Sequence, residues 1–146
     1  MSKKYYVWKE KNSKKLDKFI SDNIFFAFDN KQFDKGLEKL GVKKEEVKEK
    51  LCSLFGGGFM LKSSKKQYNK IINRMHRNKR KYLSHYPNLY NAILYEMGNY
   101  ECGYTWNFTT CLAPLGFSKK DLLKNKKLAK AFHKAKEKII AYEQSH

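Results

Sequence analysis

Lysine and arginine side chains on one predicted helix are the groups in this sequence best placed to do chemistry. No Asp or Glu occurs between Glu49 and Glu96, whereas ten Lys and Arg residues fall inside that interval. Four of them recur at helical spacing and share one helix face. They are Lys70, Arg74, Arg77 and Lys81. A solvated helix normally carries Glu four residues before such cations, and none is present. We therefore expect an external anion, with Lys66 and Arg80 contributing to its binding.

A second, weaker basic face is predicted near the C-terminus. Four lysines there lie at helical spacing on the side away from Phe132 and Ile139. They are Lys127, Lys130, Lys134 and Lys138. Because the planar Arg side chain suits phosphate better than Lys does, we expect this face to assist the first one. The expected partner is RNA or DNA, or an acidic surface of a host nucleoprotein effector. The alternative is a structural or assembly protein whose basic surface is solvated.

The N-terminal segment KKYYVWK mixes cations with aromatic rings. Tyr5, Tyr6 and Trp8 have a composition that can stack on unpaired bases while the neighbouring lysines contact phosphates. More often, however, such a segment is an edge strand or a basic and aromatic arm docked on the chain's own domain, and this is the reading we favour for residues 1–12.

Patterns typical of catalysis or metal binding are weak. The carboxylates show no metal-ligand spacing, and no phosphate loop or zinc pattern occurs. The carboxylates considered are Asp29, Asp34, Glu96, Glu101 and Asp121. We therefore predict no catalytic residue, no metal and no cofactor.

A metal-independent ribonuclease is the enzymatic alternative. His76, His85 and Tyr82 are candidates for acid and base, with Arg74 and Arg77 as a phosphate clamp. His76 lies beside the apolar stripe of its helix, however, and is expected to be a partly buried structural residue. We therefore favour a binding protein over an enzyme.

Two further groups of residues are expected to be structural. Asn99 and Glu101 lie in a polar stretch of an otherwise apolar segment, where they are predicted to form a hydrogen-bond cluster that holds a loop. Cys52, Cys102 and Cys111 are odd in number and lack CxxC spacing, so reduced core thiols are expected.

Length and composition bound the class of protein. A chain of 146 residues with 41% hydrophobic residues can bury one core, so a single domain over residues 1–146 is expected. The 32 Lys and Arg residues outnumber 14 Asp and Glu and give a net charge of +18, which favours a polyanionic partner. No apolar stretch is long enough to span a membrane, and no signal peptide is recognisable, so a cytoplasmic protein without membrane contact is expected. The oligomeric state stays open.

Hydrophobic periodicity predicts a mainly helical chain with a small β element. The apolar runs at 24–28 and 56–62 predict two antiparallel strands, which need helices to cover them. The expected fold is therefore α+β, mainly α, with helices packed around an about two-stranded antiparallel sheet. Helices or helical turns are predicted over residues 13–22, 30–40, 43–55, 64–86, 87–100, 105–124 and 126–142.

Three stretches carry a resemblance to known sequences. They are FFAFDNKQFDKGLEKLGV at 25–42, GGGFMLK at 56–62 and YEMGNYECGYTWNFTTCLAPLGFS at 95–118. Together they resemble a family of small uncharacterised proteins of bacteriophages and other mobile elements. In that family an F-x-A-F-x-x-x-Q-F start, a glycine-rich strand and an E-x-x-N-x-E segment recur in this order. The matches imply a shared scaffold, and they fall at Phe26, Phe28, Gln32, Phe33, Asn99 and Glu101.

The resemblance also implies a biological setting. Members of this family are often acidic, whereas this chain adds a strongly basic helix, so we expect function to lie in that added surface. The mobile-element context implies an anti-CRISPR-type protein that inhibits a bacterial defence system such as CRISPR-Cas in the cytoplasm of a bacterial host.

Overall fold

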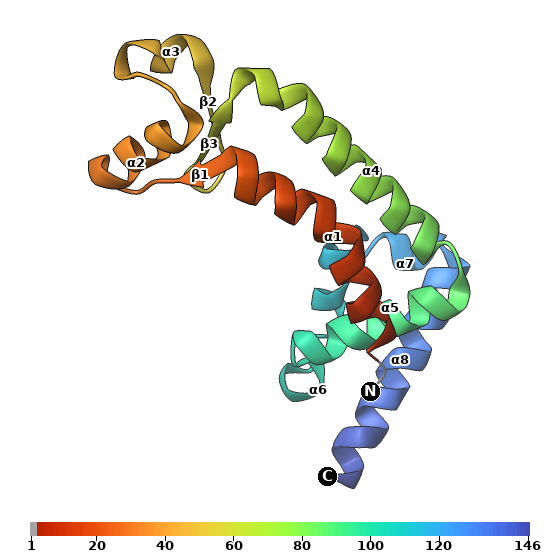
Figure 1. The fold of residues 1–146 in the computed structure, drawn as a ribbon. Coiled ribbons are helices and arrows are strands. Elements are labelled where there is room, and N and C mark those ends of the chain that lie inside the picture. The colour runs from red at the N-terminus through yellow and green to blue at the C-terminus, as the bar shows by residue number, and fades with distance from the viewer. Residues whose placement is uncertain (1–2) are drawn as a thin grey trace. The chain divides into compact units, whose positions relative to one another are not determined.

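The computed structural model describes residues 3–146, and Figure 1 shows their path. Helices dominate and one small antiparallel sheet is present, so the predicted α+β, mainly α, class is confirmed. The α-helices are α1 (Lys4–Asn23), α2 (Asn30–Leu40), α3 (Val47–Lys50), α4 (Lys65–Leu83), α5 (Tyr86–Asn99), α6 (Cys102–Thr105), α7 (Asp121–Lys124) and α8 (Lys126–Ser145). The strands are β1 (Ile24–Phe26), β2 (Leu51–Leu54) and β3 (Gly58–Leu61). Short 3₁₀ turns are η1 (Lys44–Glu46), η2 (Lys62–Ser64), η3 (Phe108–Cys111) and η4 (Ala113–Leu115).

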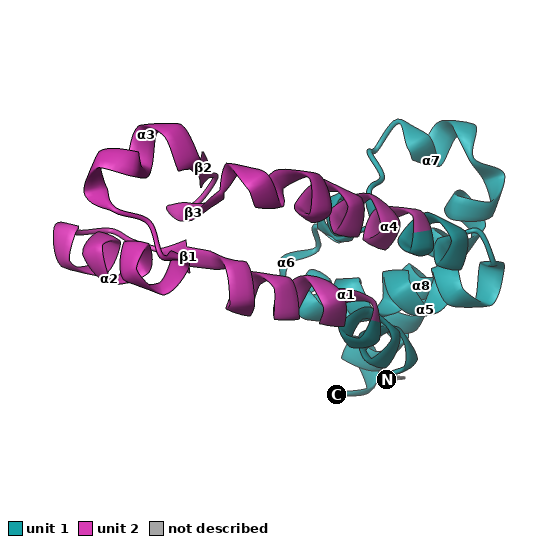
Figure 2. Cartoon of the chain, turned by 45° about the horizontal axis from the view of Figure 1, so that its top comes forward, with its two compact units in different colours: residues 1–11, 78–146 teal, residues 12–77 magenta. Residues whose placement is uncertain are grey.

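The chain divides into two compact units (Figure 2). Unit 1 takes in the chain up to Lys11 together with Asn78–His146, and unit 2 is Asn12–Arg77. Helices α1 and α4 each contribute residues to both units. The expectation of a single domain over 1–146 stays a prediction. None of the helices in the described part is long and apolar enough to cross a membrane.

Unit 2 is built on the three-stranded sheet, in the order β1-β3-β2. The predicted antiparallel pairing of the two apolar runs is confirmed, with Phe26 opposite Gly58. The sheet has three strands where about two were expected, because residues 51–54 form β2 in a stretch predicted to be helical. Leu51 has extended backbone and packs with Phe25 and Leu37, so tertiary burial outweighs the local helical pattern.

Helix α2 is placed on the sheet by its two ends and by one glycine. The Asp29 carboxylate accepts from the Gln32 backbone N–H at 2.7 Å, and the Gln32 side chain accepts from the Phe28 N–H at 2.8 Å. Gly41 ends the helix in the left-handed conformation, with φ of 69°. Gly36 leaves room for the Phe25 ring, because a Cβ there would lie 1.9 Å from Phe25 Cδ2. The helix therefore covers one face of the sheet closely.

Unit 1 has its own core, centred on α5 and α8. Leu89, Ile93 and Met97 of α5 are almost fully buried with Leu128 and Phe132 of α8. The amphipathic pattern of the C-terminal helix is thus confirmed, and α8 extends it to Ser145.

The N-terminal segment is a helix, so the expectation of an edge strand over residues 1–12 is wrong for the described residues from Lys4 onward, whereas the expected docking on the chain's own domain is seen at Tyr5 and Trp8. Tyr5 is 0% exposed, and Trp8 stacks on Tyr82 with ring centroids 4.0 Å apart. Tyr5 belongs to the core of unit 1, and Trp8 is partly buried and packs against that core. Tyr6 is 43% exposed, and its ring lies 5.9 Å from that of Tyr95. Base stacking by the buried Tyr5 is therefore wrong for this structure, whereas stacking by Tyr6 and Trp8 stays a prediction.

Candidate nucleic-acid interface

The unit 2 part of α4 carries a continuous basic face. Lys66, Lys70, Arg74 and Arg77 are all exposed, and at 100° per residue they fall within an arc of about 80°. Over about 16 Å of helix, at 1.5 Å per residue, this face can follow several phosphates. The predicted alignment is therefore present in the fold.

The opposite side of α4 determines which way this face points. Tyr68 and Ile71 pack against the sheet residues Met60 and Ile24, and the Tyr68 ring lies 5.8 Å from that of Phe19 on α1. The Asn12 side-chain amide donates to the Met75 carbonyl at 3.1 Å. Because these contacts hold the apolar side of α4 inward, the four cations must face solvent.

The four cationic side chains on this face have no polar partner within the described part of the chain. Among residues 3–146, none of Lys66, Lys70, Arg74 or Arg77 makes a side-chain hydrogen bond or an ion pair. All eight acidic residues of unit 2 precede Lys50 in the chain. The donors of these side chains are thus available to an anion from outside the chain.

Cations in the unit 1 part of α4 divide into exposed and structural ones. Arg80 and Lys81 are exposed, as a binding role requires. Lys79 turns inward, and its ammonium donates to the Pro114 carbonyl at 2.6 Å. Burial, and then the charge of Lys9, lower the pKa of Lys79. Lys79 therefore has a structural role in unit 1.

The lysines of α8 are engaged within unit 1 to a greater extent than expected. Lys127 donates to the Ser84 carbonyl at 2.7 Å. The ammonium groups of Lys130 and Lys134 lie over the rings of Tyr86 and Tyr90, at 5.2 and 5.4 Å from the ring centroids. Lys138 is exposed. Three of the four predicted contact residues thus already have partners on or next to α5, which makes this face the weaker candidate.

Glu96 is the residue that sequence reasoning undervalued. It is 1% exposed, its Oε1 lies 3.8 Å from Lys9 Nζ, and its Oε2 accepts from Asn99 at 3.5 Å. Glu101, in contrast, is exposed and precedes α6 with a positive φ of 52°. The predicted cluster of Asn99 and Glu101 is therefore wrong for Glu101, because Asn99 pairs with Glu96 instead, whose position beside Ile93 and Met97 on one helix face was the available signal.

The histidines of the ribonuclease alternative are both exposed, and that alternative stays a prediction. His76 is exposed, so the expectation that it is partly buried is wrong. Within residues 3–146, neither His76 nor His85 has a side-chain hydrogen bond that would fix its tautomer. His76 belongs to unit 2 and His85 to unit 1. The described residues also contain no group of three or more His, Cys, Asp or Glu side chains able to hold a metal ion.

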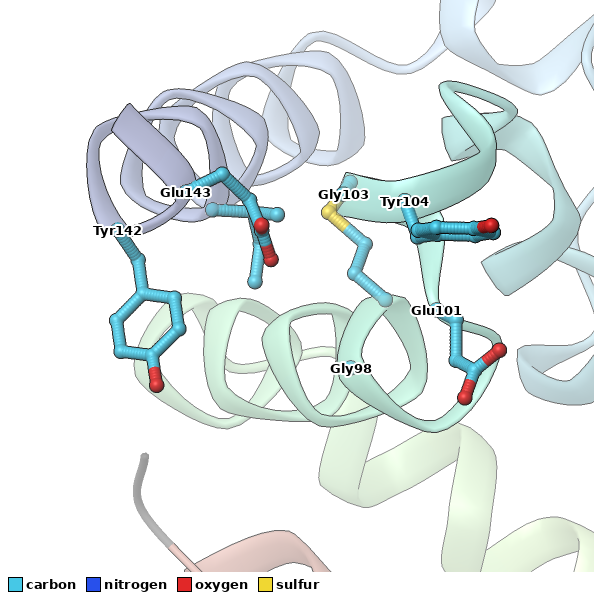
Figure 3. A pocket seen from close by; sticks show the side chains of 8 residues that line it. Gly98, Glu101, Gly103, Tyr104, Tyr142 and Glu143 are labelled. Carbon is cyan, nitrogen blue, oxygen red and sulfur yellow. The ribbon is translucent and has the colours of Figure 1, made fainter. Parts of the chain in front are cut away.

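A pocket of about 420 Å³ opens in unit 1 (Figure 3). Tyr142 and Glu143 of α8 line one side of it, and Gly103 and Tyr104 of α6 line another. Its only charged lining residues are Glu143 and Glu101. A wall with this charge repels phosphate, so the pocket is no part of the basic interface.

Comparison with known proteins gives one family. A family model matches residues 4–138, and its description is a family of unknown function (DUF7659). No curated protein and no solved structure matches the chain.

Proposed function

Because the chain belongs to this family of unknown function, which brings no activity with it, we propose a function from the geometry of unit 2. The protein binds nucleic acid, or a complex that contains nucleic acid, through the exposed face of α4 formed by Lys66, Lys70, Arg74 and Arg77. Binding rests on contacts to phosphates and is independent of base sequence.

The observation that carries this proposal is the absence of internal compensation on that face. Four cations within about 16 Å repel one another, and a helix that only needed solvation would interleave acids with them. Helix α1 does so in the same unit, since Asp17 lies between Lys15 and Lys18, and Asp22 follows Lys18 by four residues. The contrast between the two helices favours a polyanion as the missing partner of α4.

Charge reversal on α4 tests the proposal. In the variant Lys70→Glu, Arg74→Glu and Arg77→Glu, each contact to a phosphate becomes a repulsion, so affinity for labelled RNA or DNA should fall by at least about a hundredfold at low salt. Fluorescence anisotropy measures the affinity. Circular dichroism should show unchanged helix content, because all three side chains are exposed.

A matched control variant distinguishes the effect of the α4 face on affinity from the effect of the net charge. Lys14→Glu, Lys15→Glu and Lys18→Glu changes the charge of α1 by the same amount, again at exposed positions of unit 2. The proposal requires a much smaller loss of affinity here. Equal losses in both variants would mean that only the overall charge attracts the nucleic acid, and unchanged binding in the α4 variant would refute the proposal.

One prediction from the sequence lies beyond this proposal. Inhibition of a bacterial defence system stays a prediction based on the resemblance to mobile-element proteins. A pull-down from bacterial lysate with and without nuclease treatment tests it, because a nucleoprotein target bound through its RNA would be lost after nuclease.

A further inference from the structure

Three phenylalanine rings are exposed at one end of the small sheet in unit 2. Phe28 is 79% exposed, Phe55 is fully exposed, and Phe26 is 50% exposed. None of these three rings contacts another ring among the described residues, whereas Phe25 and Phe59 of the sheet pack with Phe33 of α2. A single exposed apolar residue is ordinary, but a group of three on adjacent segments marks a binding surface.

The β2–β3 hairpin holds these rings with their faces open. Phe26 lies opposite Gly58 in the strand register, and a Cβ on Gly58 would be 3.1 Å from Phe26 Cε1. A Cβ on Gly57 would be 2.7 Å from Phe28 Cε1. Two rings thus rest on glycine backbone, where side chains would otherwise stand. The connection is fixed by a hydrogen bond from the Ala27 N–H to the Gly57 carbonyl at 3.1 Å.

Phe55 stands at the turn of the same hairpin. Gly56 and Gly57, which follow it, have φ values of 82° and 83°, which glycine adopts without strain. Because the turn is short and made of glycine, nothing in it covers the Phe55 ring. The three glycines of GGGFMLK therefore serve to display rings as well as to close the hairpin.

The charge of the residues around the β2–β3 hairpin indicates which class of partner binds there. The hairpin lies inside the interval that contains no Asp or Glu, and β3 leads through η2 into the basic helix α4. Strand β3, between the glycine turn and η2, spans about 10 Å at 3.3 Å per residue, so rings and cations lie within reach of one short nucleic-acid strand. Proteins bind single-stranded nucleic acids with aromatic rings that stack on the bases and with cations that contact the phosphates. In a duplex the faces of the bases are stacked on one another and are not accessible to such rings.

We propose that Phe28 and Phe55, with Phe26 beside them, stack on unpaired bases of a single-stranded nucleic acid whose phosphates are held by the α4 cations. This inference rests on the proposed function and specifies its ligand. Phenyl rings carry no hydrogen-bonding group, so the stacking discriminates single strand from duplex and not one base from another.

Substitutions that keep the apolar volume but remove the aromatic face test the stacking. The probes are a labelled oligouridylate of about 12 nucleotides and an RNA duplex of the same length. The variant Phe28→Leu with Phe55→Leu should bind the oligouridylate about ten- to a hundredfold more weakly than the parent protein, while its affinity for the duplex stays the same. The variant Phe28→Tyr with Phe55→Tyr should retain the parent affinity for both probes.

The outcomes separate this inference from the function on which it rests. If the Leu variant binds the oligouridylate as tightly as the parent does, stacking is refuted, while loss of binding in the α4 variant would still uphold the interface. If the parent binds neither probe, the proposed function itself fails. Retention of a host protein after nuclease treatment, lost in the Leu and Tyr variants alike, would assign the rings to a protein partner and overturn the inference.

Discussion

At the scale of single residues, the lysines and arginines fall into two groups. Some have side chains that face solvent without a partner in the described structure, and others have side chains that form hydrogen bonds within the fold. Lys79 and Lys127 donate to backbone carbonyls of unit 1, while Lys70 and Arg74 have no such partner among the described residues. The sequence predicted the second pair correctly as exposed, because the helical period alone sets their face. It could not distinguish Lys127 from them, since the carbonyl that Lys127 reaches is 43 residues away.

The buried thiol of Cys111 makes the stability of unit 1 dependent on alkaline pH. Cys111 is 0% exposed, and burial, with a smaller contribution from Cys102, raises its pKa from 9.0 to about 12. Between these values the unfolded chain loses the proton while the folded chain keeps it, so stability falls as pH rises. Cys111 alone should lower the free energy of unfolding by about 1.4 kcal/mol from pH 8 to pH 10.

Urea denaturation of the parent and of Cys111→Ala at the two pH values measures this effect. Other groups also titrate here: burial raises the pKa of Tyr5, and burial lowers that of Lys79. These contributions are common to both proteins and cancel when the two pH differences are subtracted. An identical pH dependence in the parent and the variant would show that Cys111 keeps no proton beyond its ordinary range.

At the scale of elements, the long amphipathic helices were predictable and the short elements were not. Helices α4 and α8 carry apolar stripes over many turns, so local periodicity defines them. Strand β2 has only four residues, and its conformation depends on Leu51 reaching Phe25 and Leu37 from other elements. The first turns of α1 were missed for a similar reason, since Tyr5 is buried against Tyr82 and Tyr95, and Trp8 stacks on Tyr82, both far along the chain.

The contact of α2 with β1 yields a stability prediction. Gly36→Ala places a Cβ 1.9 Å from Phe25 Cδ2, and the Phe25 ring is held between Phe33 and Phe59 at centroid distances of 5.8 and 5.3 Å. The variant should lose about 1–3 kcal/mol of unfolding free energy, although Ala has the better helix propensity by about 1 kcal/mol.

A double-mutant cycle identifies the cause. With Phe25→Ala in the background, the clash is removed and Gly36→Ala should be neutral or stabilising. If the cost of Gly36→Ala is the same in both backgrounds, the Phe25 ring is not what excludes a side chain at position 36.

At the scale of the whole molecule, the net charge of +18 is less informative than its distribution. Three ion pairs occur among residues 3–146, and they involve Lys9, Lys44 and Lys50. None of them lies on α4. The composition alone predicts attraction to a polyanion, whereas the fold places the uncompensated cations on one outward helix face.

The dependence of nucleic-acid affinity on salt tests the central claim most directly. Each phosphate contact contributes about 0.7 to 0.9 to the slope of log affinity against log salt, between roughly 50 and 200 mM. Replacing Lys70, Arg74 and Arg77 by Gln should therefore reduce the slope for the parent protein by about 2 to 3, and Gln at Lys14, Lys15 and Lys18 should leave it nearly unchanged. An α4 variant with the same slope as the parent would contradict the assignment of this face as the phosphate-binding surface.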